Sequence, residues 1–226
     1  MIQNLNKDWD LFRKDQGISG TEMHDYQKSQ DIYAGYINPT IIEERKMNVA
    51  SMDVFSRLMM EKIIFLGTAI DDTVSNVVTA QLLYLSSQSE NDINMYVNSP
   101  GGGIYAGYSI FDTMNFIKNE VHTTVTGMAA SMGFLLSING SKRLCLPHSR
   151  LMLHQPLSSM GRSQATDIMI RAQQIQKLKD ETIGIIAEKC NQTIEKVSQD
   201  VERDYWMTSE EAKEYGAIDK IVGIDD

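Results

Sequence analysis

Ser131 lies in a run of small residues at positions 127–133 (GMAASMG), which suits a nucleophilic hydroxyl because a substrate can approach it closely. The run follows an apolar segment typical of a strand and precedes one typical of a helix. Free backbone N–H groups at the start of a helix stabilise negative charge. An ordinary helix N-cap is the alternative interpretation, and the pattern differs from the G-x-S-x-G turn of the α/β-hydrolases.

A nucleophilic serine needs a general base, and His154 is the best placed of the four histidines. It ends an apolar run and precedes Gln155 and Pro156, which restrict the backbone at the end of a predicted strand. A buried core histidine is an equally acceptable interpretation. A carboxylate would be needed to orient the imidazole. Spacing does not choose among the downstream candidates, which are Asp167, Asp180, Asp200 and Asp204.

The segment at positions 99–103 (SPGGG) predicts a tight turn after a strand. Successive glycines allow unusual backbone angles, so the turn could direct an N–H group at an oxyanion or surround a phosphate. It lacks the lysine and the Ser/Thr of a P-loop, which disfavours nucleotide binding. A flexible connection without chemistry is the alternative.

Short apolar segments alternate with segments of helical spacing along most of the chain. This alternation predicts an α/β fold of stacked βαβ units with right-handed crossovers. Strands are expected at residues 62–67, 93–97, 121–125, 143–146 and 151–154. Helices are expected after a cap at Asp71 or Asp72, at residues 105–118, and from about Ser131. The first helix is expected to bury Val74, Val77, Val78, Leu82 and Leu85.

Residues 164–189 form a proline-free segment whose apolar residues recur at helical spacings. A helix of this length spans about 40 Å, which exceeds what a small domain needs for its own core. We therefore expect it to form an inter-subunit interface. A capping box at residues 208–211 begins the last predicted helix, and Gly216 should end it.

The composition is that of a globular chain and disfavours several function classes. With 21 basic and 30 acidic residues, the net charge of −9 disfavours nucleic-acid binding. The two cysteines cannot enclose a metal ion by themselves and are read as buried thiols. No apolar stretch reaches the roughly 20 residues of a membrane span, and the N-terminus lacks the apolar core of a signal peptide. We therefore expect a cytoplasmic protein.

Residues 1–36 differ from the rest of the chain, because apolar residues are sparse there and charges show no sustained period. This pattern predicts a polar N-terminal extension, a candidate pro-segment. Residues 37–226 are predicted to form one domain.

Seven short motifs, in order and at near-family spacing, make the chain resemble the ClpP family, the proteolytic subunits of the Clp protease. The resemblance covers about residues 36–222 and implies a ClpP/crotonase-like spiral of stacked βαβ units, with a long-helix handle at about residues 157–190. The motifs are residues 63–67 (IIFLG), 69–72 (AIDD), 98–102 (NSPGG), 127–133 (GMAASMG), 152–156 (MLHQP), 164–167 (QATD) and 202–204 (ERD).

The resemblance implies roles for individual residues. Ser131 matches the nucleophile, His154 the general base, and Asp204 the aspartate that orients the histidine. The backbone N–H groups of Gly102 and Met132 match the oxyanion hole. The substrate would lie as an extended strand between two segments of the chain. Its implied contacts are Gly103, Ile104, Gln155, Pro156 and Leu157.

The resemblance also implies the activity and the partners. The expected enzyme is a serine endopeptidase that hydrolyses unfolded proteins through an acyl-enzyme, in protein quality control. Fourteen subunits in two stacked heptameric rings would enclose the active sites. A hexameric AAA+ unfoldase of the ClpX, ClpA or ClpC type would supply substrate and hydrolyse the ATP. No cofactor or metal is expected in this chain.

Two departures from the family pattern leave alternatives open. The segment at residues 157–163 is one residue longer and has fewer glycines than is usual, and residues 134–147 are about two residues shorter. One alternative is a crotonase-type acyl-CoA enzyme, which shares the fold and uses glycine-rich oxyanion turns. The other is a catalytically silent structural ring subunit.

Overall fold

The computed structural model describes residues 40–45, 48–158 and 161–224. The predicted extension at residues 1–36 lies outside this part of the chain. The chain divides into two units, residues 1–54 and 55–226. Within the first unit, strands β1 (Thr40–Arg45) and β2 (Asn48–Asp53) pair antiparallel, with Thr40 opposite Asp53. The predicted boundary between residues 36 and 37 stays a prediction.

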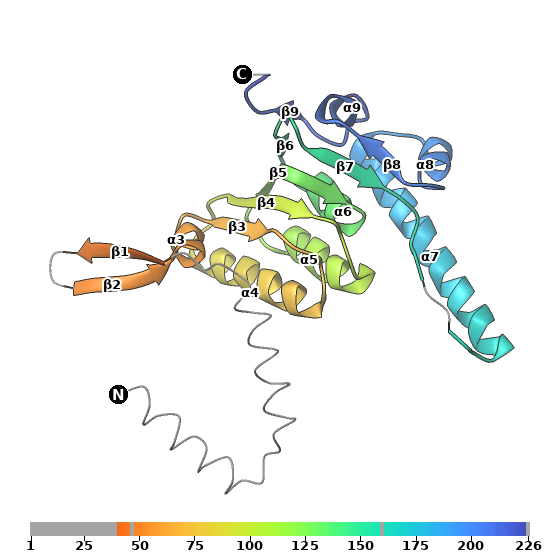
Figure 1. Cartoon of the computed structure of the whole chain (residues 1–226), viewed down its shortest axis with the longest axis horizontal. Helices are drawn as coiled ribbons and strands as arrows, with labels where there is room; N and C mark the ends of the chain where they lie inside the picture. The colour runs from red at the N-terminus through yellow and green to blue at the C-terminus, as the bar shows by residue number, and fades with distance from the viewer. Residues whose placement is uncertain (1–39, 46–47, 159–160, 225–226) are drawn as a thin grey trace, which may run out of the picture. The chain divides into compact units, whose positions relative to one another are not determined.

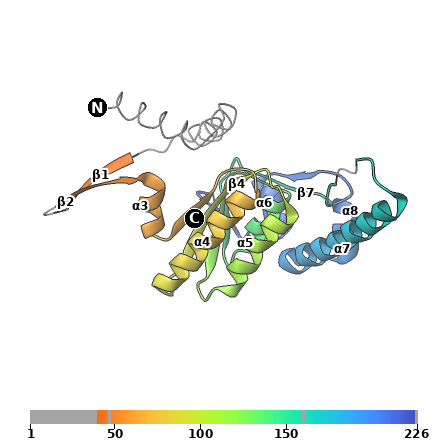
Figure 2. The ribbon, with the colours of Figure 1, turned by 90° about the horizontal axis from the view of Figure 1, so that it is seen from below.

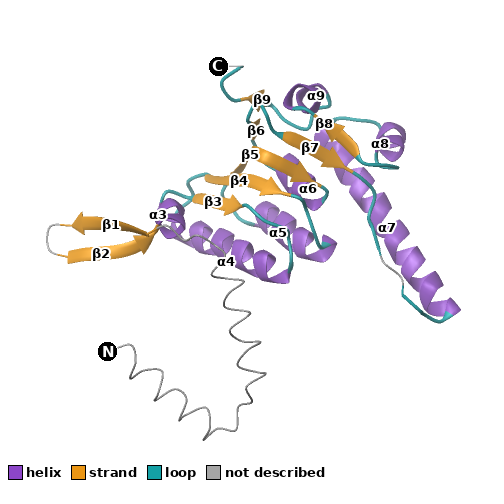
Figure 3. Cartoon of the chain, in the orientation of Figure 1, coloured by secondary structure: helices purple, strands orange, loops and turns teal. Residues whose placement is uncertain are grey.

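The second unit alternates strands and helices along the chain, as the sequence pattern predicts (Figures 1 and 3). Its elements, with α3 beginning at the unit boundary, are α3 (Val54–Met60), β3 (Ile63–Leu66), α4 (Asp72–Gln88), β4 (Ile93–Ser99), α5 (Ile104–Phe116), β5 (Val121–Ala130), α6 (Met132–Ile138), β6 (Arg143–Cys145), β7 (Arg150–Leu153), α7 (Ala165–Cys190), α8 (Ile194–Asp200), β8 (Tyr205–Met207), α9 (Ser209–Glu214) and β9 (Lys220–Ile221).

A seven-stranded sheet organises this unit, with the strand order β3-β4-β5-β6-β9. All neighbours in this path pair parallel, and β7 pairs parallel with the carboxyl end of β5. Only β8, which pairs with β7, runs antiparallel within this sheet. Parallel neighbours joined through helices are the stacked βαβ arrangement that the sequence predicts. The fold class is therefore α/β.

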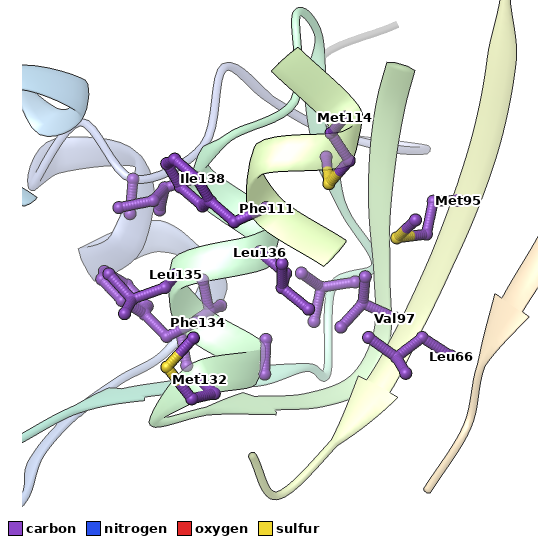
Figure 4. Packing of buried hydrophobic residues seen from close by; sticks show 14 of the residues in the cluster. Leu66, Met95, Val97, Phe111, Met114, Met132, Phe134, Leu135, Leu136 and Ile138 are labelled. Atoms are coloured by element: carbon purple, nitrogen blue, oxygen red, sulfur yellow. The ribbon is translucent and has the colours of Figure 1, made fainter. Parts of the chain in front are cut away.

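Helices α4 and α5 lie side by side against one face of the sheet (Figure 2). The core between them and the strands contains Leu66, Met95 and Val97 from the sheet, and Phe111 and Met114 from α5 (Figure 4). All seven residues of α6 are buried. The helix that follows Ser131 is thus anchored along its whole length.

Helix α4 follows the sequence prediction except at one position. Asp71 is the N-cap and accepts a hydrogen bond from the Val74 N–H at 2.8 Å. Val77 was predicted to be buried, but 52% of it is exposed. The buried stripe instead includes Ser75, whose hydroxyl donates to the carbonyl of Ala106 at 2.7 Å. A hydroxyl with a partner can replace an apolar side chain at such a contact.

Strand β5 is longer than the predicted residues 121–125, because it continues to Ala130. Gly127, Ala129 and Ala130 conceal the strand pattern, but the backbone of residues 128–130 pairs with β7. An irregularity interrupts the pairing with β4: Val97 lies opposite Val125, whereas Ser99 lies opposite Ala129. Two residues of β4 therefore correspond to four of β5, and the extra residues form a bulge that ends near Ser131.

Helix α7 has 26 residues and extends away from the sheet (Figure 1). Its buried residues begin at Leu178, whereas Ile168, Met169 and Ile170 in its first half are exposed. Near the end of the chain, α9 begins with the predicted capping box between Thr208 and Glu211, and the chain reverses after it through Gly216 at a φ of 82°. Among the helices described, none is long and apolar enough to pass through a membrane.

Candidate active site

Ser131 occupies the single position between β5 and α6. Its backbone has a φ of 54° and a ψ of −121°, which is a strained conformation for a residue with a Cβ atom. The strand pairing before it and the buried helix after it hold this conformation, since the Ser131 N–H donates to the carbonyl of Met152 at 2.9 Å. The hydroxyl makes no capping hydrogen bond with α6. The N-cap alternative therefore does not account for this serine.

The bulge in β5 is held by a side chain from the neighbouring strand. Asn98 of β4 accepts a hydrogen bond from the Met128 N–H through its Oδ1 atom at 3.0 Å. Gly127 is required here, because a Cβ atom at this position would lie 2.7 Å from the same Oδ1 atom. The asparagine replaces the missing backbone partner and fixes the strand directly before Ser131.

His154 directly follows β7, the strand beside the carboxyl end of β5. Its Nε2 atom is 2.9 Å from the Ser131 Oγ atom, which is hydrogen-bond distance. The ring is largely buried. In this geometry a neutral imidazole with a free Nε2 lone pair can accept the serine proton.

Asp204 lies on the other side of the same imidazole, with its Oδ1 atom 3.3 Å from His154 Nδ1. It directly precedes β8, and the pairing of Leu153 with Tyr205 brings the two residues together. Among the other candidates, Asp200 accepts hydrogen bonds from Lys196 and Tyr215 instead. Asp180 accepts from Gln176, and Asp167 lies in the first turn of α7.

The glycine turn packs directly against the start of α6. A Cβ atom on Gly101 would lie 2.7 Å from the Ser131 Cβ atom and 2.9 Å from the Met132 nitrogen. Gly102 has a φ of 155°, and a Cβ atom there would lie 2.1 Å from the Ile70 oxygen. Only glycine permits this approach, which explains the composition of the turn.

Ile70 holds the glycine turn in place through two backbone hydrogen bonds. The Ile70 N–H donates to the Gly101 carbonyl, and the Gly103 N–H donates to the Ile70 carbonyl, both at 2.8 Å. The N–H groups of Gly102 and Met132 have no hydrogen-bond acceptor within the described ranges. An N–H group without an acceptor in the chain can donate to a bound group, which is what an oxyanion hole requires.

A cavity of about 320 Å³ lies beside this centre. It contains four of the five predicted substrate contacts, Gly103, Ile104, Pro156 and Leu157, together with residues of α7. Gln155 instead lines a small cavity of about 20 Å³ that also contains Ser131 and His154. Gly102 and Gly103 of the glycine turn line the larger of these two cavities.

Gln155 is bound on its other side to the turn that carries Asp204. Its N–H donates to the Val201 carbonyl at 2.8 Å, and its side-chain amide donates to the Glu202 carbonyl at 3.3 Å. The N–H group of Gln155 is thus engaged within the chain. A substrate strand could therefore not accept a hydrogen bond from the Gln155 N–H, whereas the Gln155 carbonyl could still accept one from the substrate.

Sequence reasoning missed one ion pair near the site, between Lys179 of α7 and Glu202. The hydrogen bond from Lys179 lowers the pKa of the Glu202 carboxyl group. This pair connects the long helix to the turn that ends at Asp204. The two residues are far apart in sequence and on elements without a shared period, so no sequence pattern indicates their contact.

The chain matches the Clp protease family over residues 45–225. It is 54% identical over 209 residues to the ATP-dependent Clp protease proteolytic subunit of Bacteroides thetaiotaomicron, covering 91% of this chain and 93% of that protein. The same name belongs to a relative from Porphyromonas gingivalis, 54% identical, covering 91% and 92%. A third, from Bacteroides fragilis, is 55% identical over 203 residues, covering 88% and 96%.

The α/β fold and these relatives define a serine peptidase, a hydrolase. The chain belongs to the Clp protease family. Its relatives do not favour the crotonase-type acyl-CoA enzyme or the catalytically silent ring subunit.

Proposed function

We propose that Ser131, His154 and Asp204 form the catalytic triad of this serine peptidase. The observation that carries the proposal is the 2.9 Å separation between Ser131 Oγ and His154 Nε2, with Asp204 on the opposite ring nitrogen. His154 takes the proton from Ser131 as the hydroxyl attacks a peptide carbonyl. Asp204 keeps the imidazole in the tautomer with a free Nε2 and stabilises the imidazolium that forms.

The N–H groups of Gly102 and Met132 are proposed to hold the oxyanion of the tetrahedral intermediate. The intermediate collapses as His154 returns the proton to the leaving amine, which leaves an acyl group on Ser131. Water then attacks this ester with His154 as base, and the enzyme is restored. Removing one oxyanion donor costs on the order of 10²–10³ in rate.

The substrate is proposed to be an extended segment of an unfolded protein. It lies between the segment after Gly102 and residues 155–157, beside the cavity of about 320 Å³. Gly103, Ile104, Gln155, Pro156 and Leu157 are its proposed contacts. Recognition is then mostly through the main chain, and side-chain specificity is loose.

The proposed assembly is a tetradecamer of two stacked heptameric rings, with active sites inside the chamber. The exposed apolar residues in the first half of α7 support this, because they suit a contact with another subunit. The relatives are named ATP-dependent. An AAA+ unfoldase of the ClpX, ClpA or ClpC type is therefore proposed to use the ATP and to deliver substrate. The proposed location is the cytoplasm, and no cofactor is assigned to this chain.

A fluorophosphonate labelling experiment tests the triad. Mass spectrometry should locate one adduct on Ser131, and Ser131→Ala should abolish both labelling and hydrolysis of a short fluorogenic peptide. The control is Ser87→Ala, which removes an exposed hydroxyl on α4 and should label normally. An adduct on another serine, or peptide hydrolysis by Ser131→Ala, would reject the assignment. The native mass of the chain, with its N-terminal residue sequenced, tests ring number and removal of residues 1–36 together.

A further inference from the structure

A second cluster of chemically active side chains lies at the opposite end of the strand that leads to Ser131. It consists of Asp92, Glu120 and His122, whose potential ligand atoms all lie within 4.8 Å of one another. His122 is the second residue of β5, so about 30 Å of strand separates it from Ser131. The peptidase chemistry proposed above makes no use of this cluster.

The sheet itself brings the three side chains together. Strands β4 and β5 run parallel with Ile93 opposite Val121, and the Ile93 N–H donates to the Glu120 carbonyl at 2.8 Å. Asp92 and Glu120 therefore sit at equivalent positions directly before neighbouring strands. Glu120 directly precedes β5 and is two residues from His122, which is the spacing that places two side chains on one side of extended backbone. The strand pairing therefore positions His122 directly, and it positions the two carboxylates through the first residues of β4 and β5.

His122 is held in a fixed orientation by a group outside the cluster. Its ring is nine-tenths buried, with Nδ1 2.8 Å from the Ser141 hydroxyl and Nε2 3.0 Å from Asp92 Oδ2. The Ser141 hydroxyl is also 3.3 Å from the Val121 carbonyl, to which it can donate. In the tautomer in which Ser141 accepts from Nδ1–H, the Nε2 lone pair faces the Asp92 carboxylate. A second hydrogen-bond partner of this kind is typical of a metal-binding histidine.

The two carboxylates have no basic partner of their own. No Lys or Arg in the described ranges lies within ion-pair distance of Asp92 or Glu120, which leaves His122 as the only contact of this type. The Lys62 ammonium group is nearby, but it donates to the carbonyls of Leu85, Ser89 and Asn91 at 2.8–3.2 Å. When the imidazole is neutral, the two carboxylates give the cluster a charge of −2, which a divalent cation balances.

Asn119 adds an independent observation at the same corner of the sheet. It directly precedes Glu120, is 4% exposed, and its amide N–H groups donate to the carbonyls of Ser89 and Asn91. Its Oδ1 atom is buried and has no hydrogen-bond partner within the described part of the chain. A buried acceptor without a donor is costly, so a donor from outside the described chain, such as an ordered water, would stabilise this corner of the sheet.

We propose that Asp92, Glu120 and His122 bind a first-row divalent metal ion such as Zn²⁺. Donor atoms at about 2.1 Å from such an ion lie roughly 3.0–3.5 Å apart, and the 3.0 Å between His122 Nε2 and Asp92 Oδ2 fits this range. Imidazole with carboxylate favours zinc and its neighbours over Mg²⁺ and Ca²⁺, which prefer oxygen donors. The ion joins the amino ends of β4 and β5.

Zinc binding is measured by equilibrium dialysis and chelator competition on the untagged full chain. His154→Gln is present throughout, so that zinc at the active-site histidine does not contribute. One Zn²⁺ per chain should bind, and millimolar Mg²⁺ should not displace it. Asp92→Asn and Glu120→Gln should each weaken binding at least about tenfold, and Ser141→Ala by about 10–100-fold.

The matched controls are Glu90→Gln, a nearby exposed carboxylate, and His148→Ala, an exposed histidine outside the cluster; both should bind zinc normally. The two ligand substitutions preserve side-chain shape, and circular dichroism checks that the variants are folded. The proposal is rejected if no zinc binds, if Mg²⁺ displaces the zinc, or if Asp92→Asn and Glu120→Gln bind zinc as tightly as the parent chain. The cluster would then be only a His122–Asp92 hydrogen bond. Peptidase activity is not a readout, so the result is independent of the triad assignment.

Discussion

Leu153 and Tyr205 lie opposite each other on the antiparallel strands β7 and β8, and this pairing sets His154 against Asp204. The next pair along the ladder after Leu153 and Tyr205 would be His154 and Asp204 themselves. The parallel pairing of Ala130 with Met152 then sets Ser131 beside the same strand end. Three residues from separate parts of the sequence thus meet through two strand pairings.

Replacing Asp204 by Asn should leave assembly intact but lower kcat on a fluorogenic peptide by about 10³–10⁴. The amide can hold the imidazole in the wrong tautomer, with the proton on Nε2, where it cannot accept from Ser131. The control is Asp180→Asn, which alters only a carboxylate on α7 that contacts Gln176. Near-normal turnover in Asp204→Asn would mean that another carboxylate orients His154.

Replacing Gly102 by Ala should strongly impair acylation, because the new Cβ atom would lie 2.1 Å from the Ile70 oxygen at a φ of 155°. The turn must move, and one oxyanion donor moves with it. We expect the rate of fluorophosphonate labelling at Ser131 to fall by on the order of 10²-fold. Gly184→Ala is the control, since a Cβ atom there meets nothing within 4 Å beyond its chain neighbours and the nearby backbone of its own helix. Equal labelling rates in the two variants would contradict the assignment of Gly102.

Charged residues in the exposed apolar segment of α7 should separate the proposed rings. Met169→Asp combined with Ile170→Asp places two carboxylates where an apolar contact is expected, and sedimentation velocity should show single rings in place of double rings. Glu188→Lys, an exposed change in the last turns of the same helix, should sediment like the unmodified chain. If the double substitution has no effect on the sedimentation coefficient, this part of α7 is not the interface.

The ion pair between Lys179 and Glu202 should give a pH-dependent contribution to stability. The pKa of Glu202 is lowered in the folded chain, so the contribution is present above the ordinary carboxyl pKa of about 4.3 and is lost as the pH falls through the lowered value. Glu202→Gln should therefore lower the Tm at pH 7. The difference in Tm between this variant and the unmodified chain should disappear at a pH below the lowered pKa of Glu202. A difference in Tm that persisted at low pH would show that the ion pair is not its source.

The same Glu202→Gln variant should also lower kcat several-fold, since the turn before Asp204 loses its connection to α7. Lys179→Met removes the other partner and should have a similar effect on kcat with little change in KM. Lys177→Met is the matched control, as an exposed lysine on the same helix. A normal kcat in both variants of the pair would mean that this ion pair does not position the turn, and that the β7–β8 pairing and the Gln155 hydrogen bonds suffice.

Much of the fold follows from the sequence, because apolar segments and caps are local signals. The cap at Asp71, the capping box at Thr208 and the strand–helix alternation are all of this kind. The predicted burial of Val77 was wrong, because the spacing of an apolar residue beside the buried stripe of a helix resembles that of the stripe itself. The second half of β5 was missed because Gly127 and the small residues after it carry no alternating pattern.

The site was harder to derive from residues alone. Asp204 could not be chosen by spacing, since its contact with His154 depends on a pairing between strands 50 residues apart. The strained backbone of Ser131 is likewise set by the strand before it and the buried helix after it. The Lys179–Glu202 pair depends on where a long helix passes the sheet. Each of these relationships is tertiary, and no local pattern encodes it.

The bulge in β5 has a consequence for how this strand tolerates insertions. The offset between β4 and β5 changes by two residues across the bulge, from Val97–Val125 to Ser99–Ala129. An even change keeps each side chain of β5 on the same face of the sheet before and after it. One residue inserted at positions 126–128 would turn Ser131 to the opposite face, whereas two would restore its facing. An insertion in this segment must therefore contain an even number of residues to keep the Ser131 hydroxyl beside His154. The total number of inserted residues matters less.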